Sequence, residues 1–392
     1  MQNTLPDLPT SGRLLSLDAF RGLTVATMIM VNNPGDWTLS YAPLQHAPWH
    51  GWTPTDLIFP FFLFIVGVSI TYALGGPAIR RKEGTGKGEG DKGVGSKIIR
   101  RGLTLFALGL FLNFFPKFDP TNVRIPGVLQ RIGLVYIACS FIFLNTNTRQ
   151  QRWILAGILV GYWLLMTVIP VPGVGYPNLE PDTNLSAWLD NLLLTPAHVY
   201  KATKVWDPEG ILSTLPAVGT GLLGVLAGTW LRGSRPVAEK IAWLFAAGIL
   251  LSLAGLCADW FFPINKKIWT SSYVLLAGGL AMLGLATCYW LIDVVGAEKR
   301  AYQRWSLPFV AYGVNAITVF FLSGLIPRIM TLIKVSGSDG SEMGSKEYLY
   351  QTFIAPLFTD PRNASLAGAV TFILIWGVIL WIMYRKNIII KV

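Results

Sequence analysis

Residues 46–70, HAPWHGWTPTDLIFPFFLFIVGVSI, pass without a break from a polar, aromatic stretch into an apolar run. Asp56 stands where the apolar run begins, and a carboxylate there is costly unless it caps the helix, pairs, or faces a cavity. Capping explains Asp56, and an interfacial aromatic belt explains the tryptophans. Neither explains two histidines, His46 and His50, four residues apart. Histidine suits acid, base or nucleophile chemistry, so the segment is a candidate site as well as a helix start.

The composition indicates a membrane protein. Of the 392 residues, 52% are hydrophobic and only 14% are charged, against about 25% charged in soluble domains. The apolar runs of about 17–25 residues are long enough to cross a bilayer. The net charge of +11 is spread between these runs, which favours a topology signal over nucleic-acid binding. Cys139, Cys257 and Cys288 lie within apolar runs without ligand spacing, so neither a metal nor a disulfide framework is expected.

We predict an all-α fold, a polytopic transmembrane helical bundle that forms a single domain over residues 1–392. The basic residues concentrate after spans two, four, six and eight and in the C-terminal tail. The positive-inside rule therefore places these segments and both termini in the cytoplasm. Residues 76–100 then form a flexible, basic cytoplasmic loop, and residues 172–210 form an outer loop. Residues 1–12 lack a signal-peptide core, so the first span is expected to be retained. The ten predicted spans are 14–33, 57–75, 101–115, 128–145, 153–171, 211–231, 241–261, 271–292, 307–330 and 366–384.

Several polar residues stand out within or beside the first spans and elsewhere in the chain. Asp18 and Arg21 are three residues apart on the first helix and are expected to face each other as an ion pair. Asn32, at the far end of that helix, either binds a substrate or helps to end the helix. Asn315 and His198 are isolated polar residues, which we interpret as structural.

A second group of polar residues precedes spans four and six. Arg124 lies in an outer loop, whereas Gln130 and Arg131 lie inside the apolar helix, where an arginine needs an anionic partner from the protein or from a ligand. Asp207 and Glu209 look like an acidic helix start. The two carboxylates also lie on the same predicted side as the histidine segment, where they could hold an amine or a sugar hydroxyl.

Six motifs, in order over most of the chain, resemble the heparan-α-glucosaminide N-acetyltransferase family of membrane enzymes. They are LDAFRG, VNN, QHAPWHGWTPTDLIFPFFLFIVG, RIPGVLQRIG, DPEGIL and NKKIWTSSYVL. The resemblance implies acetyl transfer from cytoplasmic acetyl-CoA to the amine of a glucosamine on the far side of the membrane. It places the family's active-site histidine on His46 and its asparagine on Asn32. His50 departs from the animal pattern, which has asparagine there, and is a rival for the catalytic role.

The animal members carry a lumenal region before the first spans, and this chain resembles the compact bacterial form. An integral protein of the bacterial inner membrane is therefore expected, with free glucosamine or a small glucosamine-containing saccharide as acceptor. The expected partners are acetyl-CoA, the amino sugar and membrane lipid, and a homodimer is a candidate assembly. We expect catalytic roles for His46, Asn32, Asp56 and His50, acceptor contacts from Asp207, Glu209, Arg124 and Trp49, and donor contacts from Arg131, Gln130, Asp18 and Arg21.

In these roles, His46 acts as base or acetyl carrier, Asp56 orients a histidine, and the Asn32 amide donates to the developing oxyanion. Two other functions remain open from the sequence. One is an amino-sugar or muropeptide permease without chemistry, which the intramembrane polar residues suit equally well. The outer His-Ala-Pro-Trp-His motif argues against it, because transport does not need that motif. The other is an O-acyltransferase acting on a polysaccharide or lipid hydroxyl.

Overall fold

The computed structural model describes residues 14–75, 90–336 and 342–390. Residues 1–13 lie outside these ranges. Of the predicted cytoplasmic loop, 76–100, residues 76–89 also lie outside them. The described chain is mostly helical and falls into two compact units, each described here by itself. One unit is His46–Leu283, and the other combines Met1–Gln45 with Gly284–Val392.

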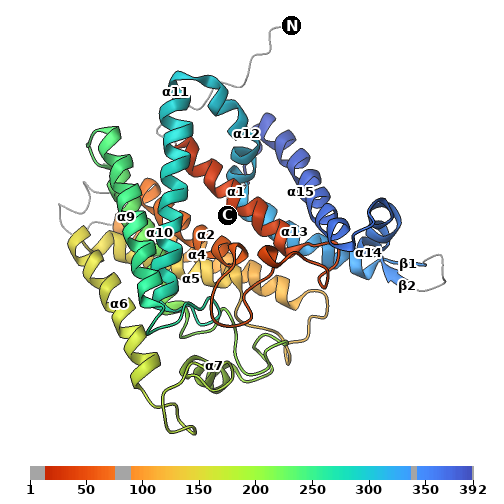
Figure 1. Cartoon of the computed structure of the whole chain (residues 1–392), viewed down its shortest axis with the longest axis horizontal. Coiled ribbons are helices and arrows are strands. Elements are labelled where there is room, and N and C mark those ends of the chain that lie inside the picture. Colours follow the sequence, from red (N-terminus) through yellow and green to blue (C-terminus); the bar gives the residue numbers. More distant parts are fainter. Residues whose placement is uncertain (1–13, 76–89, 337–341, 391–392) are drawn as a thin grey trace. The chain divides into compact units, whose positions relative to one another are not determined.

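The unit His46–Leu283 consists of long helices joined by loops that gather at the helix ends (Figure 1). Helix α2 packs against α8 and α5, α4 packs against α5, and α6 packs against α8. Helix α9 approaches α10 through Gly248 and Gly255. The elements are the 3₁₀ turn η2 (Pro54–Leu57), α2 (Ile58–Leu74), α4 (Gly90–Phe114), α5 (Val128–Asn145), α6 (Thr148–Val168), α7 (Leu185–Leu194), α8 (Thr214–Arg232), α9 (Val237–Ala258) and the greater part of α10 (Ser271–Cys288).

Glycines bring α2 and α8 into backbone contact. A Cβ atom at Gly67 would lie 1.9 Å from the carbonyl oxygen of Gly221, and one at Gly224 would lie 2.0 Å from the carbonyl oxygen of Phe64. Small residues at helix contacts are typical of membrane proteins, where close packing replaces the hydrophobic drive between helices. This contact fixes the start of α2, and with it Asp56, relative to the start of α8.

Gly67→Ala is expected to destabilise the protein, because the added methyl group has no space beside the α8 backbone. Overpacking of this kind costs about 1–3 kcal/mol. The matched control is Gly157→Ala in α6, where a Cβ atom meets no other atom within 4 Å. That control should gain about 0.5–1 kcal/mol from helix propensity. Thermal unfolding in detergent, followed by tryptophan fluorescence, measures both; equal midpoints for the two variants would contradict the tight contact.

In the other unit, α1 (Leu15–Asn32) packs against α12 (Arg300–Val314) and α15 (Pro361–Arg385). A two-stranded antiparallel sheet pairs β1 (Lys334–Ser336) with β2 (Glu342–Gly344), with Val335 opposite Met343. The remaining elements are the 3₁₀ turn η1 (Ala42–Leu44), the π-helical continuation η3 (Tyr289–Val295), α11 (Gly296–Glu298), α13 (Ala316–Leu332), α14 (Ser345–Leu349), the π turn η4 (Tyr350–Ile354) and the 3₁₀ turn η5 (Ala355–Leu357).

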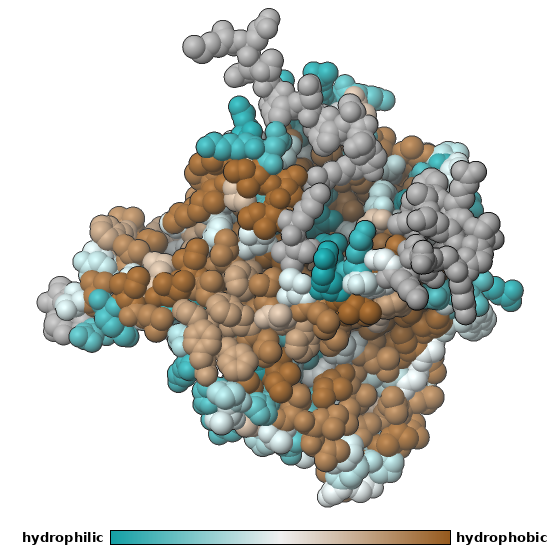
Figure 2. Space-filling view, turned by 180° about the vertical axis from the view of Figure 1, so that it is seen from behind, coloured by the Kyte–Doolittle hydropathy of each residue, from teal (hydrophilic) through white to brown (hydrophobic). Residues whose placement is uncertain are grey.

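Each predicted span contains a helix. The predicted fold class, a helical membrane protein, is therefore confirmed. Within the described residues, seven helices are long and apolar enough to cross a membrane: α2 with η2, α5, α6, α8, α9, α10 with its continuation, and α15. Apolar side chains cover much of the face in Figure 2, and large ones such as Leu250 and Leu374 are more than 60% exposed. Exposed apolar surface of this extent suits a lipid environment.

The ninth predicted span, 307–330, is not one straight helix. Helices α12 and α13 meet at Asn315 with a bend of 68°. The Asn315 side chain donates to the carbonyl of Ile388 (3.0 Å) and accepts from the backbone N–H of Ile390 (2.9 Å). The amide therefore binds the C-terminal segment, which agrees with the structural role predicted for Asn315.

Candidate active site

His46 and Asp56 form a hydrogen-bonded pair at the start of α2. His46 Nδ1 lies 2.7 Å from Asp56 Oδ1; the histidine side chain is 49% exposed and the carboxylate 1%. This contact favours the tautomer with hydrogen on Nδ1, which leaves Nε2 without a proton, 3.4 Å from Lys266 Nζ. A histidine held in this way can accept a proton or attack an acyl carbon. The expected contact between Asp56 and a histidine is present, and its partner is His46.

The same carboxylate also caps the helix start. Asp56 Oδ2 accepts from the backbone N–H groups of Ala47 and Thr53, both at 3.0 Å, and from the Thr53 hydroxyl at 3.2 Å. These bonds complete a capping box on the turn Pro54–Leu57. The Tyr273 hydroxyl donates to the Asp56 carbonyl at 2.5 Å. One oxygen of the carboxylate thus fixes the backbone while the other faces His46.

The loop between α9 and α10 lies against the histidine segment. The backbone N–H of Gly51 donates to the Ile264 carbonyl at 2.7 Å, and Lys266 Nζ lies 3.0 Å from His46 Nδ1 and 3.4 Å from Asp56 Oδ1. His50 is placed differently from His46, with Nδ1 3.4 Å from Asn265 Nδ2.

His50 is exposed and meets the Trp49 ring edge-on. Desolvation lowers the pKa of His50, and the carboxylates of Glu180 and Asp259 act in the opposite direction. The two histidines thus differ in their partners, because His46 is bonded to the Asp56 carboxylate and His50 lies beside the Asn265 amide.

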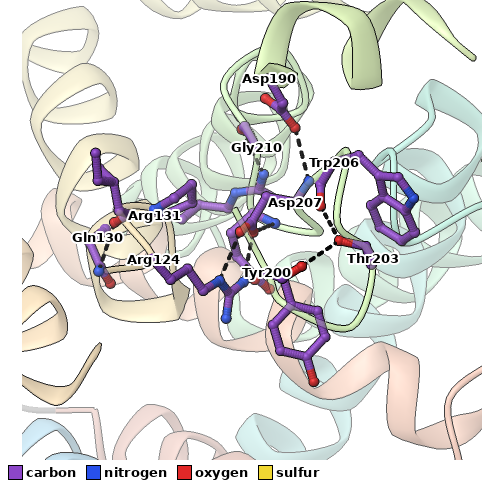
Figure 3. A network of polar contacts seen from close by, with 12 residues as sticks. Arg124, Gln130, Arg131, Asp190, Tyr200, Thr203, Trp206, Asp207 and Gly210 are labelled. Carbon is purple, nitrogen blue, oxygen red and sulfur yellow. Dashed lines mark hydrogen bonds and ion pairs between the residues drawn. The ribbon is translucent and has the colours of Figure 1, made fainter. Parts of the chain in front are cut away.

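Arg124 gathers the carboxylates that precede α8 (Figure 3). Its Nε and Nη2 donate to the two oxygens of Asp207, at 2.8 and 2.6 Å, and Nη2 also donates to Glu209 Oε2. Burial opposes the charge on Arg124, but the two carboxylates hold its pKa above the ordinary value. Burial likewise disfavours ionised Glu209, and Arg124, Arg131 and Lys266 together keep its pKa below the ordinary value. A bidentate pair of this kind fixes geometry as well as charge.

Arg131 is fully enclosed beneath this pair. Its Nη2 donates to the Gly210 carbonyl at 3.0 Å and to the Ser213 hydroxyl at 2.5 Å. The guanidinium also lies over the Trp269 ring, 5.1 Å from the centroid. The side chain of the preceding residue, Gln130, donates to the Ile125 carbonyl at 3.0 Å. Arg131 therefore supports the segment that carries Asp207 and Glu209, at the same end of the unit as His46.

Asp190 of α7 holds the loop before α8 from the other side (Figure 3). Its carboxylate accepts from the backbone N–H groups of Asp207 (3.1 Å) and Ile211 (2.9 Å). Burial raises the pKa of Asp190 to about 6, although these two bonds act in the opposite direction. Sequence analysis overlooked Asp190, because a single carboxylate in a short helix carries no local signal.

The two clusters adjoin and form one site, where the starts of α2, α5, α8 and α10 meet. The rings of Trp49 and Trp206 meet edge to face, with centroids 5.1 Å apart, and the Trp49 indole donates to the Leu179 carbonyl at 2.8 Å. Lys266 and Glu209 attract each other across the boundary. His198 stands apart from this chemistry, since its Nδ1 lies 2.7 Å from the Val123 carbonyl oxygen, as expected of a structural residue.

The remaining predicted residues belong to the other unit. Arg21 donates to Asp18 at 2.8 Å, so the expected ion pair is present. Asn32 is the last residue of α1 and is exposed, and the Asn33 side chain next to it donates to the Ile29 carbonyl at 3.1 Å. Among the described residues, no group of three or more His, Cys, Asp or Glu side chains is arranged to hold a metal ion.

Lys266 is a second site residue, after Asp190, to which the sequence reading assigned no role. Lys266 and Lys267 precede an apolar helix on the predicted outer side, whereas the positive-inside rule places basic residues on the cytoplasmic side. Two lysines on the opposite side were therefore a signal that could have marked the segment.

The fold and the site define a polytopic helical membrane protein with a carboxylate-bound histidine at the ends of its helices. Comparison with known proteins specifies the class further: the chain belongs to the heparan-alpha-glucosaminide N-acetyltransferase family, whose catalytic-region model matches residues 13–264. The human heparan-alpha-glucosaminide N-acetyltransferase is 28% identical over 436 aligned residues, covering 97% of this chain and 60% of the human protein. The mouse protein is 27% identical, covering 98% and 61%. The chain thus spans about three fifths of the length of these relatives, and the family predicted from the motifs is confirmed.

Proposed function

We propose that this protein is a membrane acetyltransferase that transfers acetyl from acetyl-CoA to the amine of glucosamine or a small glucosamine-containing saccharide. The observation that carries the proposal is the pair of His46 and Asp56, in which the carboxylate lies against Nδ1 and favours an unprotonated Nε2. The names of the human and mouse relatives support the reaction class and the acceptor. His46 acts either as the base that deprotonates the amine or as a nucleophile that carries the acetyl group.

On the acceptor side, Glu209 is the carboxylate we assign to the amino sugar, with Trp49 beside it. Asp207 is 2% exposed and gives both oxygens to Arg124, so its role is to position Arg124 and the loop. Glu209 is paired with Arg124 through Oε2, is attracted by Lys266, and has a second oxygen, Oε1, besides the one in that pair. A charge-assisted bond from the acceptor to that oxygen is worth about 1.5–3 kcal/mol.

On the donor side, Arg131 and Gln130 remain candidates for contact with acetyl-CoA, together with Asp18 and Arg21 in the other unit. Arg131 lies at the same end as His46, so a donor that reached Arg131 would present its thioester near the histidine. Asn32 remains our candidate for an oxyanion donor. We propose the bacterial inner membrane as the location, with His46 on the outer side and the donor entering from the cytoplasm.

The decisive assay uses purified protein in detergent with labelled acetyl-CoA and glucosamine, and follows N-acetylglucosamine. The matched acceptor control is N-acetylglucosamine itself, whose amine is blocked while its hydroxyls remain. Label on glucosamine alone supports N-acetylation, whereas label on both sugars points to O-acylation. Uptake of glucosamine into proteoliposomes without any acetyl transfer would favour the permease.

Sidedness gives a separate prediction, tested in a background without the three native cysteines. Tyr176→Cys, in the loop predicted to be outside, should react with an impermeant thiol reagent on intact cells. Arg149→Cys, in the first turn of α6 and on the predicted cytoplasmic side, should react only after permeabilisation. Both native side chains are exposed, so access to the reagent depends on the membrane. The reverse pattern would overturn the orientation and the transmembrane transfer with it.

A further inference from the structure

The Lys266 ammonium contacts both members of the hydrogen-bonded pair, His46 and Asp56. Its Nζ lies 3.0 Å from His46 Nδ1, 3.4 Å from His46 Nε2 and 3.4 Å from Asp56 Oδ1, and 16% of its side chain is exposed. Asp56 already accepts hydrogen bonds from two backbone N–H groups and a hydroxyl, besides its contact with His46. The carboxylate therefore has hydrogen-bond donors besides the lysine, and Lys266 Nζ lies nearer to the His46 ring than to Asp56 Oδ1.

The loop that carries Lys266 is held rigidly. Asn265 is fully buried, and its Oδ1 accepts from the backbone N–H groups of Lys267 (2.8 Å) and Ile268 (3.2 Å). The backbone N–H of Thr270 donates to the Asn265 carbonyl, and the Thr270 hydroxyl accepts from the Asn265 N–H. Asn265 also forms a backbone bridge with Gly51 in the histidine segment. Together these bonds fix the lysine relative to His46 before any substrate arrives.

The electrostatic surroundings of Lys266 are mixed. Burial lowers the pKa of Lys266, and the carboxylates of Asp56 and Glu209 act in the opposite direction, while Lys267 adds to the lowering. His46 and these three charged groups are the titratable neighbours around Nζ. A partly desolvated ammonium beside the Asp56 carboxylate is a stronger hydrogen-bond donor than one in water.

Acyl transfer needs a donor at this place. When a nitrogen bonds to the thioester carbon, the carbonyl π pair moves to oxygen and creates an oxyanion. In the route through acetyl-histidine, Nε2 is the attacking nitrogen, and the oxyanion collapses as the C–S bond breaks with its electron pair on sulfur. The glucosamine amine then attacks the same acyl carbon through a second oxyanion, the C–Nε2 bond breaks, and the proton of the amine passes to the released Nε2. An acyl carbon bonded to Nε2 has its oxygen about 2–2.5 Å from that nitrogen by ordinary bond lengths. Lys266 Nζ, 3.4 Å from Nε2, is within hydrogen-bond reach of such an oxygen.

We propose that Lys266, as its ammonium, donates a hydrogen bond to the oxyanion formed during acyl transfer at His46. This inference rests on the proposed function and adds a catalytic residue to it. Lys266 keeps its proton throughout, so the alkaline limb of the pH profile reports its ionisation. Activity should fall as the pH rises through the lysine pKa, which lies below that of an ordinary lysine.

The test compares Lys266→Met and Lys266→Arg with the wild type in the full-length protein. Removing one oxyanion donor costs about 10²–10³ in kcat, so Lys266→Met should lose that much with a smaller change in the KM for glucosamine. Lys266→Arg should recover part of the loss and should stay active at alkaline pH, because its guanidinium keeps its proton. The charge-matched control is Lys117→Met, an exposed lysine on an outer connection, which should behave as the wild type.

The outcomes separate the two proposals. A wild type without acetyl transfer contradicts the proposed function itself. An active wild type beside a Lys266→Met variant with kcat within threefold overturns only the role of Lys266. If Lys266→Met fails to fold, judged by thermal midpoint and detergent-extracted size, the pH profile of Lys266→Arg decides. An alkaline limb identical to that of the wild type overturns the inference, and a limb moved to higher pH supports it.

Discussion

Replacing His46 by alanine is expected to lower kcat for acetyl transfer by about 10²–10⁴-fold, the usual contribution of a positioned proton acceptor. The side chain is 49% exposed, and its Nδ1 contacts are with Asp56 and Lys266. Its loss should therefore change folding little. Initial rates with glucosamine at saturating acetyl-CoA measure the effect, and the size of the detergent-extracted protein shows whether the fold is kept.

His50→Ala is the matched control, because His50 lies in the same segment without the bond to Asp56. Its loss should cost less than that of His46. If His46→Ala keeps near wild-type turnover, the assignment is wrong and His50 is the next residue to test. If the double variant is also active, histidine catalysis at this site must be abandoned.

The same variant distinguishes a base from an acetyl carrier. Wild-type protein given labelled acetyl-CoA without acceptor should retain label after rapid quench if His46 forms an acetyl-histidine, and His46→Ala should not. Absence of label from the wild type, together with normal turnover, favours direct attack by the amine with His46 as base.

The helices could be predicted because each span is a local property of the sequence. A run of about 20 apolar residues satisfies its own backbone only as a helix in lipid, so the run itself defines the element. The third predicted span, 101–115, shows the limit: α4 begins at Gly90, since a helix continues through polar residues such as Arg100 once its N–H groups have partners. Hydropathy marks where a helix is apolar and does not mark where it begins.

The contacts of the site could be predicted only in part. Asp56 lies ten residues from His46 and six from His50, so the sequence was enough to propose a contact between Asp56 and a histidine, but not to choose His46. Arg124 and Asp207 are 83 residues apart, and Lys266 and His46 are 220 apart. Their meeting depends on which helix starts share an end of the unit, which follows from the packing of α2 on α8 and α5. Motif spacing along the chain carries no information on that packing.

Asp56→Asn is expected to lower kcat by about 10²–10⁴-fold while the protein stays folded. The asparagine keeps the size of the side chain and one oxygen for the cap bonds from Ala47 and Thr53. Its NH₂ group, however, would face His46 Nδ1 as a donor. That arrangement favours the tautomer with hydrogen on Nε2, the nitrogen to which the proposed function assigns proton acceptance or attack. Loss of the negative charge also removes a partner from Lys266.

Asp56→Ala separates the catalytic from the capping role of this carboxylate, since alanine can form neither set of bonds. Loss of the cap costs about 0.5–2 kcal/mol, so the thermal midpoint should fall further in Asp56→Ala than in Asp56→Asn, while both lose activity to a similar degree. Thr53→Ala removes one cap donor and leaves the bond to His46, so it should lower the midpoint and largely preserve kcat. If Asp56→Asn retains kcat within tenfold of the wild type, the carboxylate serves α2 as a cap and does not orient His46 for chemistry.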